Sequence, residues 1–267
     1  MAEATNPFTA VILAGKRPGK DPVAEAAGVA CKSFAPIGGR AMVLRVLDAL
    51  AATRQVGSQI LCGPSQSIIA REPELKARIE TGQVKWMDSL ATPSASTYRV
   101  LQSLPPNIPV LVTTSDHALL SAQIVDFFCD QARRSGCDLA VGLASYKGVR
   151  EAFPETRRTA IKFNDDAYCG CNLFGFLNQQ SHRAAAFWRQ IEQERKKPLH
   201  MMRVLGWWTV LQYISGRFSL AQGLEKLSAK IHIRVRAVLL PFPQAAVDVD
   251  TVDDWHFVQQ LAQRQSL

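Results

Sequence analysis

The chain has 267 residues, of which 47% are hydrophobic and 20% are charged, the balance of an ordinary folded protein. This composition excludes collagen-like, low-complexity and largely disordered proteins, and no apolar run is long enough to span a membrane. Lys and Arg number 31 against 23 Asp and Glu, so a net charge of +8 favours anionic partners such as phosphorylated metabolites. Nucleic acid is not an expected partner, because no helix-turn-helix, zinc-finger or RNA-binding signature is present.

The first half of the chain alternates short apolar runs with amphipathic segments. Strands are predicted at residues 9–13, 59–61, 84–87, 109–113 and 138–144. Helices are predicted at residues 40–53, 94–104 (capped by Ser94) and 121–134. Alternating strands and helices predict an α/β fold of three layers, with helices on both faces of a mostly parallel, mixed sheet.

The second half is less regular. Strands are predicted at residues 156–162, 172–177, 230–235 and 246–249. Helices are predicted at residues 181–196, 199–216, 220–227 and 251–263, the last with Thr251 as its N-cap. Residues 199–227 are interpreted as a helical insertion, either a lid or the surface of a homodimer. Because no linker or internal repeat is visible, a single domain over residues 1–267 is expected.

Two features bear on the compartment. Residues 1–6 lack the basic and apolar regions of a secretory signal, so a cytoplasmic protein is expected. The six cysteines are scattered, and none of them forms a C-x-x-C pair. They are interpreted as buried or idle thiols in a reducing environment.

The first motif is LAGKRPGK at residues 13–20, directly after the first predicted strand. Such a loop can present backbone N–H groups and cationic side chains to phosphates. It is not a Walker A loop, because Gly15 and Gly19 are one residue too close and Asp21 replaces the Ser or Thr. It also lacks the G-x-G-x-x-G dinucleotide spacing. The pattern leaves two interpretations open, phosphate binding and a plain strand-to-helix turn.

Three further motifs follow along the chain. Lys32 is followed by IGGRAMV at residues 37–43, where a Gly-Gly turn leads into a helix. Asp116 follows the strand at 109–113, at the end where open α/β sheets bind ligands. DVDT at residues 248–251 places carboxylates before the last helix. Carboxylates of this kind suit Mg²⁺, although Asp116 alone also fits a helix N-cap.

Together these motifs resemble the Rossmann-like nucleotide-diphospho-sugar transferase fold and, within it, the nucleotidyltransferases similar to molybdenum-cofactor guanylyltransferase. The resemblance rests on LAG at 13–15, Arg17, Lys32, IGGRAMV at 37–43, DHALL at 116–120 and DVDTVDDW at 248–255. These blocks occur in the family's order and span nearly the whole chain. Lys16 departs from the family's second glycine, Ala118 replaces its usual proline, and the segment from Arg17 to Lys32 is longer. These departures bear on the choice of substrate more than on the chemistry.

The resemblance implies an enzyme that transfers a nucleoside monophosphate from a nucleoside triphosphate, CTP or GTP before ATP, to a small phosphorylated metabolite. The acceptor phosphate is already an anion at pH 7, so no general base is needed. Arg17 and Lys32 would be catalytic by neutralising phosphates, and Asp116 and Asp250 would hold Mg²⁺, with Asp248 the alternative to Asp250. The residues implied in nucleotide binding are Leu13, Ala14, Gly15, Lys16, Pro93, Ser94, Ser96 and Ser115.

Alternatives remain open. A molybdenum-cofactor guanylyltransferase or a sugar-1-phosphate uridylyltransferase would keep the fold and the reaction type. A nucleotide-sugar glycosyltransferase commonly carries D-x-D at the central strand, where this chain has Ser115-Asp116-His117. A non-catalytic nucleotide-binding module is the alternative from another class. The basic residues from Arg157 and Arg158 to Lys162 suit either a solvated strand face or an acidic acceptor.

Overall fold

The computed structural model describes residues 6–15, 19–156, 158–194 and 218–265. Its strands are β1 (Phe8–Leu13), β2 (Pro36–Ile37), β3 (Arg40–Ala41), β4 (Val56–Gly63), β5 (Lys85–Asp88), β6 (Val110–Thr114), β7 (Leu139–Ser145), β8 (Ile161–Lys162), β9 (Ala167–Phe176) and β10 (Val235–Leu239). Its α-helices are α1 (Pro22–Ala26), α2 (Met42–Ala51), α3 (Gln66–Ile69), α4 (Pro73–Glu80), α5 (Pro93–Ser103), α6 (Ala122–Arg134), α7 (Tyr146–Ala152), α8 (His182–Glu194), α11 (Leu220–Ile231) and α12 (Val252–Gln265). Short 3₁₀ turns occupy Lys32–Phe34, Gln179–Ser181 and Pro243–Ala246.

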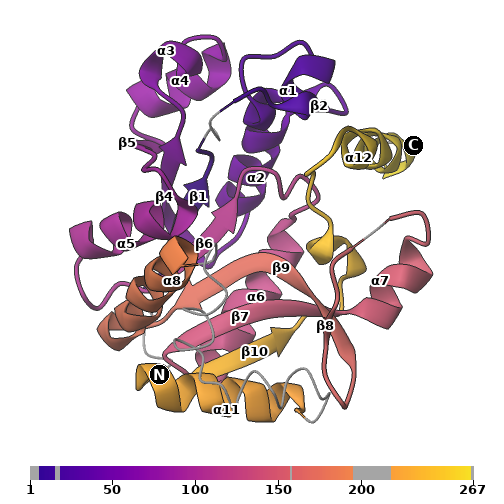
Figure 1. Ribbon diagram of the computed structural model, residues 1–267. Coiled ribbons are helices and arrows are strands. Elements are labelled where there is room, and N and C mark those ends of the chain that lie inside the picture. Colours follow the sequence, from indigo (N-terminus) through magenta and orange to yellow (C-terminus); the bar gives the residue numbers. More distant parts are fainter. Residues whose placement is uncertain (1–5, 16–18, 157, 195–217, 266–267) are drawn as a thin grey trace.

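One mixed sheet organises the described chain (Figure 1). Its strand order is β10-β7-β9-β6-β1-β4-β5, with β8 paired to β9. The pairs β6–β1, β1–β4, β4–β5 and β10–β7 are parallel, whereas β9 runs antiparallel to both β6 and β7. The expected α/β class with a mostly parallel, mixed sheet is therefore confirmed.

Side-chain alternation along β1 sets the two helical layers. Phe8, Ala10 and Ile12 point into one core, which they share with apolar residues of α2 and α6. Val11 points into the opposite core, formed with α5, α8 and the end of α11. Both cores are buried because helices cover both faces of the central strands (Figure 1). None of the described helices is long and apolar enough to cross a bilayer. All six cysteines are buried, as predicted.

Several predicted elements of the second half differ in the structure. The alternation at 230–235 is not a strand: α11 extends to Ile231, and His232 ends it with a φ of +54°. Ile231, Ile233 and Val235 are buried, as the alternation predicts. The apolar face of α11 nevertheless favours a helix as far as Ile231 over a strand. The strand starts only at Val235, where β7 supplies a partner.

Two other predicted strands form only in part or not at all. Residues 246–249 end a 3₁₀ turn and continue as an unpaired segment, because β6 is already flanked by β1 and β9. Of residues 156–162, only Ile161–Lys162 forms a strand.

The predicted cap of the helix at 94–104 also differs. The N-cap of α5 is Thr92, whose side chain accepts from the Ala95 N–H, and not Ser94.

The predicted insertion at 199–227 falls largely outside the described residues. Only its end, from residue 218, is described, and α11 begins there at Leu220.

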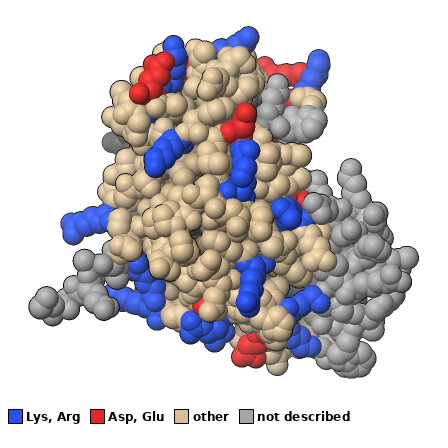
Figure 2. Space-filling view, turned by 90° about the vertical axis from the view of Figure 1, so that its left-hand side faces the viewer, with Lys and Arg blue, Asp and Glu red and all other residues tan. Residues whose placement is uncertain are grey.

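Figure 2 shows the side of the molecule that lies to the left in Figure 1. Lys and Arg are scattered over this face among uncharged residues and do not gather into one patch. A groove of about 510 Å³ beside edge strand β5 is lined by Ile60, Ile79, Gly82, Val84, Lys85, Trp86, Met87, Ser103 and Leu104. None of these residues belongs to the predicted site.

Candidate active site

The loops after β1 and β6 leave the same edge of the sheet side by side. Leu13 is the register partner of Thr114, and the Ser115 N–H donates to the Leu13 carbonyl at 3.0 Å. The Ala14 N–H in turn donates to the Cys62 carbonyl at 2.8 Å. The carboxyl ends of parallel strands form the ligand-binding edge of open α/β sheets. The predicted residues 13–15 and 115–116 therefore meet at that edge.

Three predicted residues from distant parts of the chain converge there. The Lys32 Nζ donates to Asp116 Oδ2 at 2.6 Å and to Asp250 Oδ1 at 3.3 Å. It also donates to the Val249 carbonyl at 2.9 Å. The lysine lies in the 3₁₀ turn at Lys32–Phe34, Asp116 lies in the turn directly after β6, and Asp250 lies in the segment before α12. The tertiary fold thus assembles the cluster from three sequence motifs.

The cluster is graded from buried to exposed. The side chain of Lys32 is 19% exposed and that of Asp116 16%, whereas that of Asp250 is 54% exposed. Burial disfavours the ammonium, but Asp116 and Asp250 outweigh it and raise the pKa of Lys32 above its ordinary value. Lys32 therefore keeps its positive charge between the two carboxylates.

The two carboxylates also fit a hard cation. The second oxygen of Asp116, Oδ1, is buried and has no hydrogen-bond partner among the described residues. Asp250 is exposed at the edge of the same cluster. No group of three or more His, Cys, Asp or Glu side chains suited to a metal occurs among the described residues. Proteins commonly bind Mg²⁺ through one or two carboxylates, and water and substrate phosphates complete its coordination.

Asp248 lies in a different environment from Asp250. A guanidinium N–H of Arg158 donates to its carboxylate, and Asn172 donates to its second oxygen at 2.9 Å. Burial raises the pKa of Asp248, and the neighbouring Asp116 and Asp250 raise it further. The interpretation of Arg158 as part of a solvated strand face is wrong, because its side chain is only 7% exposed. Its predicted companion Arg157 lies outside the described residues.

The loop between β5 and α5 contacts the loop after β1. A Cβ added to Gly15 would lie 3.0 Å from the Cβ of Ser89, so the two backbones approach closely. The hydroxyl of Ser96, near the start of α5, accepts from the N–H of Leu90 in this loop at 2.8 Å. Pro93, which opens α5, is exposed at its first turn. Two loops more than 70 residues apart in the sequence are therefore in close contact at this end of the sheet.

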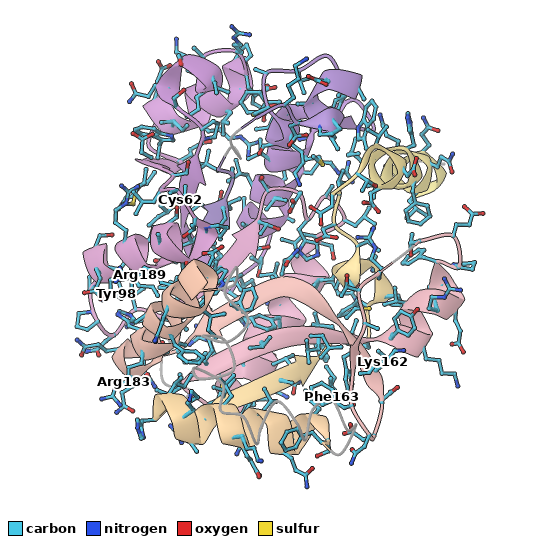
Figure 3. The ribbon with its side chains drawn as sticks, in the orientation of Figure 1. Cys62, Tyr98, Lys162, Phe163, Arg183 and Arg189 are labelled. Atoms are coloured by element: carbon cyan, nitrogen blue, oxygen red, sulfur yellow. The ribbon has the colours of Figure 1, made fainter. Side chains whose placement is uncertain are left out.

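Helix α8 supports the start of α5. The Ser94 N–H donates to Glu192 Oε2 at 3.2 Å, and the buried Ser94 hydroxyl donates to the same carboxylate. Figure 3 shows Arg189 of α8 near Tyr98 of α5, with the guanidinium 4.6 Å from the ring centroid. The carboxylate of Glu192 thus occupies the N-terminus of α5, where the helix dipole favours a negative charge.

Two further residues lie against the cluster. The Ser115 hydroxyl, which is buried, bonds to the Ser33 hydroxyl at 2.8 Å and so links the loop after β6 to the turn that carries Lys32. His117 is buried behind Asp116. Burial lowers the pKa of His117 to about 4, although Asp116 acts in the opposite direction. His117 is therefore neutral at pH 7.

The predicted residues Lys16 and Arg17 lie outside the described residues. Lys32, Asp116 and Asp250 form one cluster, and Ser115 lies against it. Gly15 approaches Ser89, in the loop that leads into the helix carrying Pro93, Ser94 and Ser96. Sequence reasoning missed Asn172 and Glu192, which reach the site from β9 and α8. The only sequence signal for Asn172 was its place in a predicted strand, and a lone polar residue there has no specific interpretation.

A family model described as the MobA-like NTP transferase domain matches residues 10–232. The chain belongs to this family. It is therefore an enzyme of the nucleotidyltransferase type that uses a nucleoside triphosphate, and the predicted resemblance is confirmed. The match includes the motifs at 13–15, 32, 37–43 and 116–120 and ends before the one at 248–255.

Several solved structures are similar in fold to this MobA-like chain. A hypothetical transferase from Thermus thermophilus is 27% identical with a TM-score of 0.77, covering 93% of this chain and 99% of that one. A 4-diphosphocytidyl-2C-methyl-D-erythritol synthase from Anaerococcus prevotii is 15% identical with a TM-score of 0.58, covering 97% and 99%. A CMP-2-keto-3-deoxy-manno-octonic acid synthetase complexed with CTP is 11% identical with a TM-score of 0.58, covering 97% and 100%. The latter two establish likeness of fold alone. No curated protein sequence matches this chain.

Proposed function

We propose that this enzyme transfers a nucleoside monophosphate from CTP or GTP to a small phosphorylated metabolite and releases pyrophosphate, with Mg²⁺ as its cofactor. The convergence of Lys32, Asp116 and Asp250 at the carboxyl edge of β1 and β6 carries this proposal. Such a cluster offers one fixed positive charge and two carboxylates where a triphosphate meets the sheet edge.

Each predicted residue has a role in this proposal. The backbone of Leu13, Ala14 and Gly15 and the side chains of Lys16 and Arg17 would hold the triphosphate. Lys32 would neutralise charge on the reacting phosphates. Pro93, Ser94 and Ser96 would shape the loop that faces the base, because the two hydroxyls already bond within the protein. Ser115 would hold the Lys32 turn against the strand end.

Asp116 and Asp250 would hold Mg²⁺, since one offers an unpartnered oxygen and the other an exposed carboxylate. When bound, Mg²⁺ supplies Lewis-acid stabilisation of phosphate charge. The protein residues orient the two reactants. An ionised acceptor phosphate needs no general base, so the main task is to bring the anionic acceptor and the anionic triphosphate together.

The choice of CTP or GTP rests on two observations. Two solved structures of similar fold are named for cytidylyl or CMP products, one of them complexed with CTP. The family is described as MobA-like, which matches the resemblance to guanylyltransferases. CTP is favoured slightly, and GTP is the alternative that the same experiment decides.

The test uses the full chain with ATP, GTP, CTP or UTP, Mg²⁺ and a panel of small phosphate monoesters. Pyrophosphate release is measured with a coupled pyrophosphatase assay. One triphosphate is expected to support release with one class of acceptor. Two outcomes would overturn the proposal. Pyrophosphate release that needs no acceptor phosphate would mean that the chain hydrolyses the triphosphate. No pyrophosphate release with any triphosphate, together with cleavage of a nucleoside diphosphate-sugar, would favour a glycosyltransferase.

Matched variants locate the chemistry. Asp116→Asn should lower the rate by about 100-fold or more, because it removes a charge at the transferring phosphate. Asp253→Asn is the control, since Asp253 is exposed in the first turn of α12. It should keep nearly full activity. Equal losses in both variants would show that Asp116 has no special role.

A further inference from the structure

Asp248 is held by a buried arginine. Arg158 Nη1 donates to the Asp248 carboxylate and, at 2.9 Å, to the Asp248 carbonyl oxygen. Its Nη2 donates to Asp254 Oδ1 at 2.7 Å. The guanidinium therefore joins the segment before α12 to the first turn of that helix. A planar guanidinium suits this bridge, because it directs several donors in fixed directions.

A second side chain bonds to the other oxygen of Asp248. Asn172 of β9 donates to Asp248 Oδ2 at 2.9 Å. Its φ of +47° is in the left-handed region, and the register of β7 against β9 shifts between Val141 and Leu143, opposite this residue. Such a bulge re-aims a side chain, and a strained residue persists only where its surroundings require it. Here the bulge directs Asn172 to Asp248.

The next residues along the chain meet the cluster. The Val249 N–H donates to the Asp116 carbonyl at 3.1 Å, and the Val249 carbonyl accepts from Lys32. Asp250 is more exposed than Asp248 and contacts Lys32. Both oxygens of Asp248 accept hydrogen bonds from Arg158 and Asn172, whereas the side chain of Asp250 is 54% exposed. Asp248 thus fixes the backbone segment from which Val249 and Asp250 contact Lys32.

We infer that Asp248 is a positioning residue, clamped by Arg158 and Asn172, and that Asp250 alone of this pair is a cation ligand. This inference rests on the proposed function, because it assigns roles within the proposed Mg²⁺ site. The positive charge of Arg158 also offsets repulsion among Asp116, Asp248 and Asp250. Without the clamp, the segment that presents Asp250 would lose its fixed distance from Lys32 and Asp116.

The test measures Mn²⁺ binding to the full chain by electron paramagnetic resonance, with Mn²⁺ as the probe for Mg²⁺. Asp250→Asn should abolish detectable binding, because it removes a ligand. Asp248→Asn and Arg158→Gln should each weaken binding by about 10-fold, the usual effect of losing a group that orients a ligand. Arg158→Lys should not restore it, since one ammonium cannot bridge Asp248 and Asp254.

A double variant tests whether the residues act as a unit. Asp248→Asn with Arg158→Gln should weaken binding no more than the worse single variant. Asn172→Gly removes the hydrogen bond, suits the φ of +47° and provides a milder variant if the others fail to fold. Arg234→Gln is the matched control, because it breaks an Arg–Asp pair with Asp138 elsewhere and should leave Mn²⁺ affinity unchanged.

Two results would overturn the assignment. Complete loss of Mn²⁺ binding in folded Asp248→Asn would make Asp248 a ligand, and wild-type affinity in that variant would remove its positioning role. Multiplying losses in the double variant would also contradict the clamp. Failure of the proposed function is distinguishable, because then the wild-type chain itself binds no Mn²⁺.

Discussion

The ammonium of Lys32 lies 2.6 Å from Asp116 Oδ2, and the same nitrogen donates to Asp250 and to the Val249 carbonyl. The lysine therefore stands between the two carboxylates proposed to hold the cation. Since like charges repel at such distances, the ammonium and a bound cation compete for the same negative charge. This relationship makes the affinity of the site for a cation depend on Lys32.

Lys32→Met should consequently strengthen cation binding while it lowers the rate of turnover. Without the competing ammonium, Mn²⁺ should bind the nucleotide-free chain more tightly, and Mg²⁺ should raise the melting temperature more than in the wild type. Pyrophosphate release should fall by about 100-fold or more, because the charge that stabilises the reacting phosphates is lost. Weaker Mn²⁺ binding in this variant would mean that the lysine organises the carboxylates and does not compete.

Gly15→Ala should weaken nucleotide binding. The new Cβ would meet the Cβ and Oγ of Ser89 at 3.0 and 3.2 Å, so the loops after β1 and β5 must separate. We expect a rise of about 10-fold in the KM for the triphosphate, since small displacements of positioning groups are costly. Gly148→Ala in α7 is the control: its Cβ would lie 3.9 Å from the nearest atom, and KM should not change. An unchanged KM in Gly15→Ala would exclude this loop from the nucleotide site.

Ser94→Ala should loosen the contact between α5 and α8. It leaves the Glu192 carboxylate without the hydroxyl donor, so the free energy of unfolding should fall by about 1–3 kcal/mol. Urea denaturation measures this loss, with Ser103→Ala at the far end of α5 as the comparison. If stability is unchanged but the KM for the triphosphate rises, then the hydroxyl contacts nucleotide directly.

His117 predicts a pH dependence of stability. Its pKa in the folded chain is about 4, below the ordinary 6.5, so between these values the unfolded chain binds a proton that the folded chain does not. The free energy of unfolding should therefore fall as the pH is lowered from about 6.5 toward 4, by up to about 1.4 kcal/mol per pH unit. Above pH 7 this residue contributes no slope.

The matched variant is His117→Asn, compared with the wild type by urea denaturation across pH 4–8. Carboxylates elsewhere titrate equally in both chains, so the difference between the two curves reports His117. That difference should be flat above pH 7 and should change steadily below about 6.5. Parallel curves over the whole range would show that His117 is accessible to protons in the folded chain.

The first-half strands of the main sheet were predictable because each contains an apolar run bounded by turn residues, whereas β2 and β3, of two residues each, were not predicted. Thr9–Leu13 and Pro109–Thr113 agree with β1 and β6 to within one residue at either end. The segment at 230–235 was not predictable in this way, since its alternation of buried residues spans a helix end, a left-handed turn and the first residue of β10. Pairing with β7 decides where the strand begins, and pairing is not a local property.

The same contrast separates the parts of the site. Lys32, Asp116 and Asp250 were found because each belongs to a motif with a recognisable order along the chain. Arg158, Asn172 and Glu192 belong to no motif, and their roles come from partners 76 to 98 residues away in the sequence.

The sequence by itself determined the α/β class, the edge of the sheet that carries the site, and the residue types able to hold phosphates and a cation. Hydrophobic periodicity and motifs at strand ends are local properties of the sequence, so they can be recognised without a structure. Only the tertiary structure decided that Lys32 lies between Asp116 and Asp250 and that Asp248 is bound by Arg158 and Asn172. These contacts depend on strand order and on a bulge in β9, which place distant side chains within hydrogen-bonding distance of one another.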